Sequence, residues 1–445
     1  MEEIGKTGLN FDFEFLDLND LDTQGLHLLK FDCATILIPK KSEYVIKKYF
    51  PATTLNKIDS DKEVAVEKCL IVLSDLVSTY YTDNKWKSLN SEILNNQTKK
   101  QNDNTFVYKY IIEALKKGSS NGSLIEVLKN ELGKEVFIKG EQSKQYKISD
   151  KYTKSKLIRY KLKTEYLIER RRMHFFDILS TAVENTIGKN LINIYSLISI
   201  PTVEYLLAKG KSLSKDNYTT KKGKLLTVRN KHKNNYWTDN QRRSFVEDNI
   251  ELFKYLTVDG FIIPNVGGQR SGGRVVDSFT LMPSWIRNEI KISGEETVEI
   301  DFKCLHPNIA ASLYGGNKNY INHKEVSEKL KVDIKTVKIE HLSFFNKEPN
   351  EMKKSVLFDY YNQFEKWMLD NILKDKYENG YKITSYKMFA KETEIMTEVI
   401  KQLNLRGIYV VYVYDALLCK KSDYKVVKDV MNRVVIDKNV YTLAE

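Results

Sequence analysis

The segment IYVVYVYDALLCKK, residues 408–421, is the sequence feature that most constrains the fold. It contains two runs rich in Val, Ile, Tyr and Leu, with Asp415 between them. Such residues fit a pleated, partly buried backbone, and the interval between the two runs is very short. The segment therefore predicts a tight β-hairpin that carries Asp415 at or near its turn.

A second aspartate is expected where another strand ends. The run VEIDF at Val298–Phe302 predicts a short buried strand that ends around Asp301. The residues HPNIAASLY after it predict a helix with Pro307 in its first turn, where the missing N–H costs nothing. Residues Tyr386–Leu403 have the apolar spacing of a helix, and LNLRG ends that helix shortly before the hairpin.

Two carboxylates from different strands are what phosphoryl transfer by two metal ions requires. One Mg²⁺ ion activates the attacking 3′ hydroxyl, and the other neutralises the triphosphate as pyrophosphate leaves. Each aspartate alone has an ordinary explanation, since Asp301 could cap a helix and Asp415 could make a turn. The prediction of a metal site therefore depends on the two residues together.

The formal net charge of +12 and the pI of about 9.1 predict a polyanionic partner. Clustered Lys and Arg gain affinity for nucleic acid by releasing the counterions condensed on phosphate. A Lys-rich genome would give the same composition without such a partner. We expect no membrane span and no secretion signal, because the chain has neither a long apolar run nor a basic start followed by one. Four cysteines without a CxxC pair predict reduced thiols in a cytoplasmic protein.

Two basic stretches are candidates for nucleic-acid contact. Residues 143–173 contain eleven Lys or Arg and three acids, and residues 217–243 contain eight Lys or Arg and one acid. Aromatic residues are spread among these cations: Tyr146, Tyr152, Tyr160, Tyr166, Tyr218, Tyr236 and Trp237. The first stretch could follow a phosphate backbone with its rings against bases, or it could be a solvated helix face. The second stretch predicts a loop or linker.

Four motifs in order resemble those of the A-family DNA polymerases and the related single-subunit phage and mitochondrial RNA polymerases. The chain is most similar to short phage-borne members whose motif A has the form D-x-x-x-L-H-P. The motifs are a glycine-arginine turn (GGRVVDSFTLMPSWIRNEI, from Gly272), motif A (VEIDFKCLHPNIAASLYGG, from Val298), motif B (EMKKSVLFDYYNQ, from Glu351) and motif C (YVYDALLC, from Tyr412). The resemblance covers roughly residues 250–435.

The resemblance implies a metal-binding set and a set of substrate contacts. Asp301, Asp415 and the backbone carbonyl of Phe302 would hold two Mg²⁺ ions, which Mn²⁺ could replace. On a fingers helix, Lys354 would face the incoming triphosphate, and a shift of one residue would give Lys353 that role. The remaining implied substrate contacts are Phe358 near the base, Arg274 and Tyr414, with Arg270 and Arg287 as further arginine candidates.

His306 would lie beside the sugar. In A-family DNA polymerases a bulky side chain five residues after the motif A aspartate screens the sugar 2′ carbon, and this chain has His306 there. The histidine could exclude the 2′ hydroxyl by its bulk, or it could hydrogen-bond to that hydroxyl and admit ribonucleotides. The sequence leaves both alternatives open.

Several residues depart from the pattern of the larger family. Asn350 replaces an arginine before the fingers lysine, where Lys347 could substitute, and Asn362 replaces the expected end of motif B. In motif C, Tyr414 replaces a common histidine and Ala416 replaces the second acid of the DNA polymerases. Both a divergent active enzyme and a decayed one fit these changes. Because both aspartates and a lysine are present, we expect an active enzyme.

The expected architecture is a right-hand polymerase of the α+β class. We expect an N-terminal region of unknown role at 1–140, a basic helical thumb-like region and linker at 141–245, an antiparallel palm sheet at 246–316 and 395–445, and small helical fingers at 317–394. The expected activity is template-directed nucleotidyl transfer from nucleoside triphosphates, with DNA synthesis slightly favoured over RNA synthesis. The alternatives are a template-independent nucleotidyltransferase in a phage or defence context and a catalytically inactive nucleic-acid-binding protein. Nucleic acid template and primer, nucleoside triphosphates and an accessory replication or transcription protein are the expected partners.

Overall fold

The chain folds into mixed helices and short sheets. The computed structural model describes residues 25–81, 86–102, 104–117, 123–137, 143–152, 156–229, 239, 241–317 and 320–445. The strands in these ranges pair antiparallel, except that β7 (Leu225–Thr227) and β8 (Arg243–Phe245) pair parallel. The predicted α+β class with an antiparallel central sheet is therefore confirmed. In the described ranges no helix is both long and apolar enough to cross a membrane.

The residues before the central sheet form a separate N-terminal lobe with its own apolar core. This core extends from Ile36 to Leu167, and α3 runs through its centre with residues 65–73 all buried. The elements of the lobe are β1 Thr35–Pro39, α1 Ser42–Tyr49, α2 Ala52–Ile58, α3 Lys62–Asp75, β2 Lys87–Ser88, α4 Ser91–Thr98, α5 Tyr108–Lys117, β3 Ile125–Val127, β4 Gln145–Ile148 and β5 Leu157–Lys161. Because β4 pairs with β2 and β3, and β5 pairs with β1, the lobe continues past the boundary expected at residue 140.

The first basic stretch belongs to this lobe and to the helix that follows it. The interpretation of its tyrosine rings as base contacts is wrong for Tyr146, Tyr152 and Tyr160, which are buried in the lobe core. The helical alternative is wrong for residues 157–161, which form strand β5. Arg170 donates to the backbone carbonyls of Lys99 and Lys100, and Arg171 donates to that of Cys33. These two arginines therefore hold separate segments of the lobe together.

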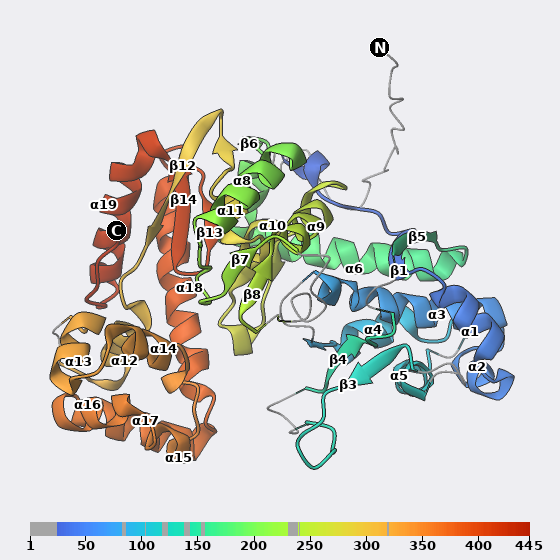
Figure 1. Ribbon diagram of the computed structural model, residues 1–445, viewed down its shortest axis with the longest axis horizontal. Coiled ribbons are helices and arrows are strands. Elements are labelled where there is room, and N and C mark those ends of the chain that lie inside the picture. Colours follow the sequence, from blue (N-terminus) through green and yellow to red (C-terminus); the bar gives the residue numbers. More distant parts are fainter. Residues whose placement is uncertain are drawn as a thin grey trace.

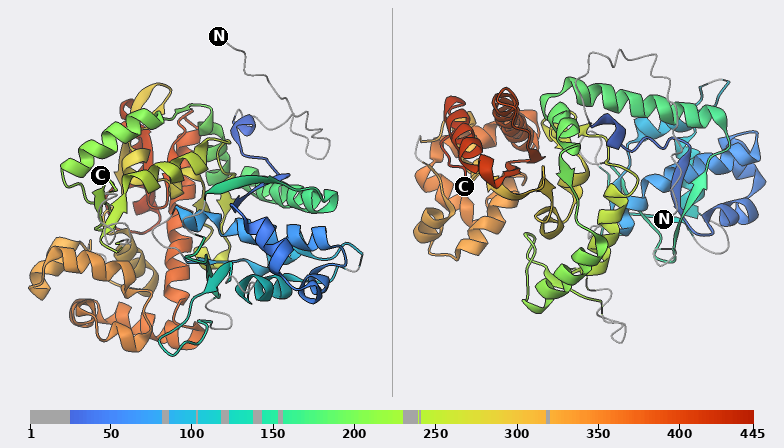
Figure 2. Two further views of the ribbon diagram at one scale, coloured as in Figure 1. Left: turned by 45° about the vertical axis from the view of Figure 1, so that its right-hand side comes forward. Right: turned by 90° about the horizontal axis from the view of Figure 1, so that it is seen from above.

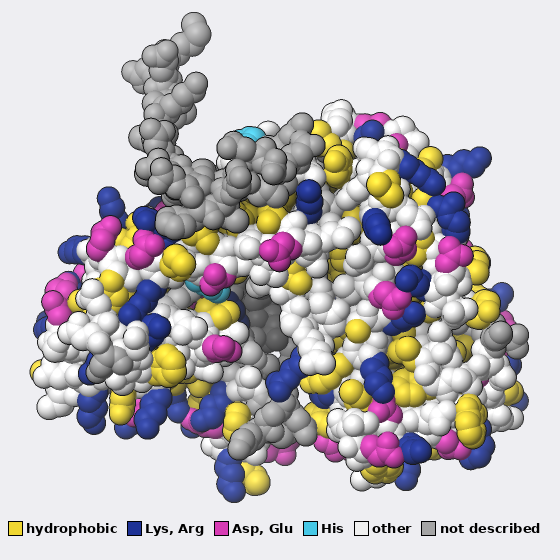
Figure 3. All heavy atoms as spheres, turned by 180° about the vertical axis from the view of Figure 1, so that it is seen from behind, with side chains coloured by type: hydrophobic (Ala, Val, Ile, Leu, Met, Phe, Trp, Pro, Cys, Tyr) yellow, Lys and Arg dark blue, Asp and Glu magenta, His cyan; other side chains and the backbone are white. Residues whose placement is uncertain are grey.

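A long helix, α6 (Glu165–Glu184), joins the lobe to the rest of the molecule (Figures 1 and 2). The carboxylate of Glu67 on α3 accepts hydrogen bonds from the N–H groups of Lys163 and Thr164, at 2.7 and 3.0 Å, just before α6 begins. Leu167 near its start lies in the lobe core, whereas Leu179 and Ala182 near its end lie in the larger core of the C-terminal part. From behind, the surface is hollowed between the lobe and the rest of the chain, with Lys and Arg side chains near the lower rim (Figure 3).

Helix α7 (Thr186–Tyr195) follows after a break of one residue, Asn185, whose side chain accepts hydrogen bonds from the first turn of α7. The buried Asn190 of α7 exchanges two hydrogen bonds with the backbone of Val410, at 2.7 and 3.3 Å. Val410 directly precedes the strand that leads into the hairpin, so α7 holds one end of that hairpin in place.

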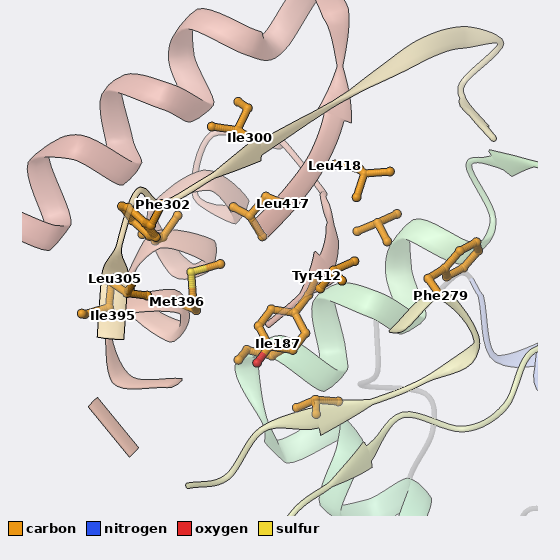
Figure 4. Packing of buried hydrophobic residues seen from close by; sticks show 14 of the residues in the cluster. Ile187, Phe279, Ile300, Phe302, Leu305, Ile395, Met396, Tyr412, Leu417 and Leu418 are labelled. Carbon is orange, nitrogen blue, oxygen red and sulfur yellow. The ribbon is translucent and has the colours of Figure 1, made fainter. Parts of the chain in front are cut away.

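The central sheet has the strand order β13-β14-β12-β11-β6. Its strands are β6 Ile198–Ser199, β11 Lys291–Ile292, β12 Glu295–Asp301, β13 Val411–Val413 and β14 Ala416–Lys420. The side chains alternate between its two faces. Ile300 and Leu417 face the helical layer that includes Met396, whereas Leu418 lies on the other face, toward Phe279 (Figure 4). By the same alternation, Asp301 and Glu299 project from the face away from those helices.

Helices α18 (Ile383–Asn404) and α19 (Tyr424–Asp437) cover the apolar face of the sheet. The glycine-rich turn between β9 (Asn265–Val266) and β10 (Val275–Val276) packs against the first half of α18. Gly272 has φ +65°, and a Cβ there would overlap the backbone of Phe389 and Ala390, so the close approach requires glycine. The turn thereby holds Arg274 over α18.

The remaining helices surround the sheet or form a layer below it (Figure 1). Those around the sheet are α8 Val203–Lys215, α9 Val246–Thr257, α10 Ser278–Leu281 and α11 Ser284–Arg287. Those of the layer are α12 Leu305–Tyr314, α13 His323–Leu330, α14 Ile334–Phe344, α15 Pro349–Met352, α16 Val356–Phe364 and α17 Lys366–Asn379. Pro307 lies in the first turn of α12, as predicted, and all four cysteines are free thiols.

Candidate active site

The hairpin and the strand end meet as the sequence predicted. Strands β13 and β14 are joined by the two residues Tyr414 and Asp415, and Tyr414 takes the positive φ of 60° that such a tight turn needs. Ala416 pairs with Val413 on one side and with Asp301 on the other. The N–H of Phe302 also points at the carbonyl of Asp415, at 3.5 Å. Asp301 and Asp415 therefore lie at the same end of two adjacent strands.

The two carboxylates lie where a negative charge is poorly stabilised. Burial raises the pKa of Asp415 to about 7, and the negative charges of Asp301 and Glu392 contribute to this shift. Burial also raises the pKa of Asp301, against the positive charge of Lys221. Oxygen Oδ1 of Asp301 is buried and has no hydrogen-bond partner among the described residues. A bound cation would relieve both conditions.

Lys221 comes from the second basic stretch and ion-pairs with Glu299, two residues before Asp301 on the same strand face. Part of that stretch thus lies at the site, whereas Tyr236 and Trp237 lie outside the described residues. Arg287 also approaches Glu299, at 3.5 Å, but it is only 4% exposed. It donates to the carbonyls of Phe279 and Met282 at 3.1 and 3.2 Å. Arg287 Nη1 thus braces the end of α10, whereas its buried Nε has no partner among the described residues, so a contact between Arg287 and substrate stays a prediction.

A second charged cluster lies on the other side of the hairpin turn. Glu392 of α18 is fully buried and receives hydrogen bonds from Arg274 Nε at 2.7 Å and from Arg274 Nη2. His306 Nε2 lies 2.7 Å from the same carboxylate and 3.2 Å from Arg274 Nη2. Burial opposes ionisation of Glu392, but these two partners outweigh it and hold its pKa below the usual value.

Aromatic rings enclose this cluster. The Arg274 guanidinium lies 3.7 Å from the ring centroid of Phe389 and 5.1 Å from that of Tyr414. His306 also packs near Phe389, with 5.7 Å between ring centroids. The structure therefore brings Arg274, His306 and Tyr414 together, but Glu392 takes Nε and Nη2 of Arg274, so the wholly free guanidinium expected for a phosphate is not observed.

Sequence reasoning missed the part that Glu392 takes in this cluster. Glu392 is one of a series of residues at helical spacing whose other members, such as Ile395, Met396 and Val399, are apolar and buried. A single acid on the core-facing stripe of a helix is costly unless it is paired. That position was the signal that a cationic partner would be found elsewhere in the chain.

The predicted fingers helix is wrong in its local geometry. Residues 351–363 are split into α15 and α16, because the Ser355 side chain caps α16 and a turn at residues 353–354 separates the two. Lys353 and Lys354 lie in this turn, and Lys354 is exposed and pairs with Glu351, three residues earlier. Phe358 is on α16, partly buried against the core of the C-terminal part. Arg270 is exposed in the glycine-rich turn.

The donor set at the strand ends is small. Among the described residues, no group of three or more His, Cys, Asp or Glu side chains is arranged to hold a metal ion. The available donors are two carboxylates and the backbone carbonyl of Phe302. Mg²⁺ is commonly bound by one or two carboxylates, with substrate phosphates and water completing its six ligands. The residues present are therefore compatible with magnesium that arrives with a phosphate substrate.

Comparison with known proteins adds little to this geometry. No family model matches the chain, and no curated protein matches it. One similar solved structure is the POL domain of Pol1 from M. smegmatis, in complex with DNA primer-template and dNTP. It is 11% identical, and the alignment covers 63% of this chain and 72% of that one with a TM-score of 0.38. At that TM-score the likeness supports no argument about fold or activity. Any conclusion about function must therefore rest on the chain's own residues.

Proposed function

We propose that the chain is a nucleotidyltransferase that extends a nucleic acid primer along a template, with deoxynucleoside triphosphates slightly preferred over ribonucleoside triphosphates. One observation carries the proposal: Asp301 and Asp415 lie together at the end of adjacent strands, with raised pKa values and with a buried Asp301 oxygen that has no partner in the part of the chain that the structure describes. Paired carboxylates of this kind are the protein part of a two-metal phosphoryl-transfer site.

Two Mg²⁺ ions, or Mn²⁺, would be held by Asp301, Asp415 and the Phe302 carbonyl, and would supply activation of a 3′ hydroxyl and stabilisation of the leaving pyrophosphate. The residues around the two aspartates adjust the electrostatic potential at the site. Lys221 reduces the negative potential on the sheet face that carries Asp301, through its ion pair with Glu299. The fold proposed to support this chemistry is a palm made by residues 246–316 and 395–445.

His306 and Arg274 would act at the sugar and the primer end. Because both are fixed by the buried Glu392, their positions are set before any substrate arrives. A fixed imidazole suits the selection of sugars, because both exclusion of the 2′ hydroxyl by bulk and a hydrogen bond to it require a defined ring position. The hollow between the N-terminal lobe and the rest of the chain, with cations near its rim, suits a polyanion (Figure 3). A cytoplasmic location and an accessory replication or transcription protein belong to the same proposal.

Primer extension tests the proposal directly. Labelled primer on template is incubated with dNTPs or NTPs and Mg²⁺, and the wild type is compared with Asp301→Ala and Asp415→Ala. We expect each substitution to reduce incorporation about 10³-fold or more, because each removes one of the few metal donors. Glu296→Ala is the matched control, since Glu296 is an exposed acid on the same strand that pairs with Lys421.

The outcomes separate the proposed function from its alternatives. Incorporation that survives both aspartate substitutions contradicts the proposal. Extension that needs no template identifies a terminal transferase, and a DNA mobility shift without any incorporation identifies an inactive binding protein. The ratio of dNTP to NTP incorporation gives the sugar preference that His306 would impose.

A further inference from the structure

Nucleotidyl transfer requires a cation near the polyphosphate of the incoming nucleotide, and Lys354 is poorly placed for that role. Ser355, the next residue, donates to Glu340 of α14, and Lys347 also pairs with Glu340 at 2.7 Å. The turn that carries Lys353 and Lys354 is therefore docked on the Glu340 side of α14. Lys354 already has Glu351 as its ion-pair partner.

The opposite edge of α14 is connected to the beginning of α12 by a chain of contacts that runs through the start of α13. Asn308, in the first turns of α12, exchanges two hydrogen bonds of 2.9 Å with the backbone of Ile321. His323 follows at the start of α13, and its ring centroid lies 4.9 Å from that of His341 on α14. Helix α12 itself begins four residues after Asp301. This edge of α14 is thus tied to the strand end that carries the catalytic aspartate.

Lys338 projects from that edge. It lies three residues before His341, close to one helical turn, whereas Glu340 is two residues away and points about 200° around the helix. The positive charge of Lys338 contributes to lowering the pKa of His323, which burial brings to about 4. Lys338 is exposed and has no ion pair among the described residues. Its charge is therefore available to a ligand.

The surface around Lys338 is apolar and uncovered. Leu342, one turn further along α14, is 80% exposed, and Ile339 is 55% exposed. Single exposed apolar side chains are normal on protein surfaces, so these two bear on binding only because they adjoin a cation. A cation beside such a surface matches a nucleotide, which combines a polyanionic tail with a base whose flat faces pack on apolar side chains.

We propose that Lys338 binds the triphosphate of the incoming nucleotide, with Ile339 and Leu342 beside the nucleoside, and that Lys353 and Lys354 do not take this role. The inference rests on the proposed function for its substrate. An ammonium group here offsets charge that grows on the leaving pyrophosphate, as an added cation does in phosphoryl transfer generally.

The experiment compares Lys338→Ala with Lys354→Ala, since both are exposed lysines of the same helical layer. In steady-state primer extension we expect Lys338→Ala to lower kcat/KM for dNTP about 10- to 100-fold, the range for loss of a charged hydrogen bond. Lys338→Arg should recover most of the loss, and Lys354→Ala should stay within about twofold of wild type.

Binding of a fluorescent dNTP in the presence of Ca²⁺ is measured on the same variants. Lys338→Ala should weaken binding of the triphosphate but not of the matching monophosphate. Equal behaviour of the two alanine variants in both assays overturns the inference, as does a defect confined to Lys354→Ala. If the wild type extends no primer while Lys338→Ala still weakens triphosphate binding, the proposed function fails and the nucleotide site stands.

Discussion

The two residues of the hairpin turn belong to two unlike charged regions. The side chain of Tyr414 packs against Arg274, in a cluster where Glu392, Arg274 and His306 satisfy one another. Asp415, the next residue, belongs to a region where two carboxylates repel and where Oδ1 of Asp301 has no hydrogen-bond partner within the described ranges. The first region is complete without a ligand, and the second is not. The contrast indicates that the paired cluster positions groups, while the carboxylate pair is left incomplete for a cation to fill.

Removing the buried anion of the complete cluster should have the largest effect on stability. Glu392→Ala removes the fully buried anion and leaves the partly buried Arg274 without its partner, and we expect a loss of about 3 kcal/mol in the free energy of unfolding. Denaturant unfolding measures this. Glu394→Ala, on the same helix but exposed and paired with Lys391 and Lys438, should cost about 1 kcal/mol or less. Equal losses from the two substitutions would remove the distinction between the clusters.

Removing the Asp415 anion from the incomplete region should instead increase the free energy of unfolding. The folded-state pKa of Asp415 is about 7, above the unfolded value, so its ionisation destabilises the fold increasingly as the pH rises from about 4 to 7. Asp415→Asn should therefore be more stable than wild type by about 2–4 kcal/mol at pH 8, and no more stable at pH 4. Unfolding curves across this pH range, without divalent ions, test it. A variant less stable than wild type at pH 8 contradicts the account.

Magnesium should stabilise only the incomplete region. At about 10 to 100 times the dissociation constant, a bound ligand adds about 1–3 kcal/mol to the wild type. In Asp415→Asn the added ion should raise the melting temperature little, whereas in Glu394→Ala it should act as in wild type. Thermal melts with and without Mg²⁺ provide the measurement, and an equal shift in all three proteins would place the ion elsewhere.

The smallest expected effect concerns the ring that joins the two regions. Tyr414→Ala removes a cation–π contact with Arg274 and should cost about 1 kcal/mol in stability, while Tyr414→Phe retains the ring and should cost less. If both variants unfold like wild type while Glu392→Ala does not, the ring takes no part in holding Arg274. Denaturant unfolding at pH 7 resolves a difference of this size.

Local patterns were sufficient for the central part of the fold. The hairpin around Asp415, the strand ending at Asp301 and the helix at 383–404 follow from apolar runs, short intervals and helical spacing within a few residues. These elements also bring the two aspartates together, because neighbouring strands of one sheet share an end. The helical spacing marks Glu392 as an acid on a core-facing stripe, but no local signal reveals its partners, which are 86 and 118 positions away.

The predictions that failed also did so because of contacts between distant parts of the chain. The stretch 143–173 was a candidate for nucleic-acid contact, but carbonyls from distant parts of the lobe accept hydrogen bonds from its Arg170 and Arg171. The helix expected through Lys354 is interrupted because the Ser355 side chain caps α16 and bonds to Glu340. In each case a tertiary hydrogen bond decides the conformation, and composition or spacing within one segment does not contain it.

The long helix between the lobe and the sheet also has a mechanical meaning. At 20 residues, α6 is an unbroken rod of about 30 Å, anchored at one end by Glu67 and followed after a single residue by α7. Asn190 of α7 is hydrogen-bonded to the backbone of Val410, directly before the strand that leads to Asp415. The lobe is therefore linked to the hairpin turn at Asp415 through α6, Asn185 and α7.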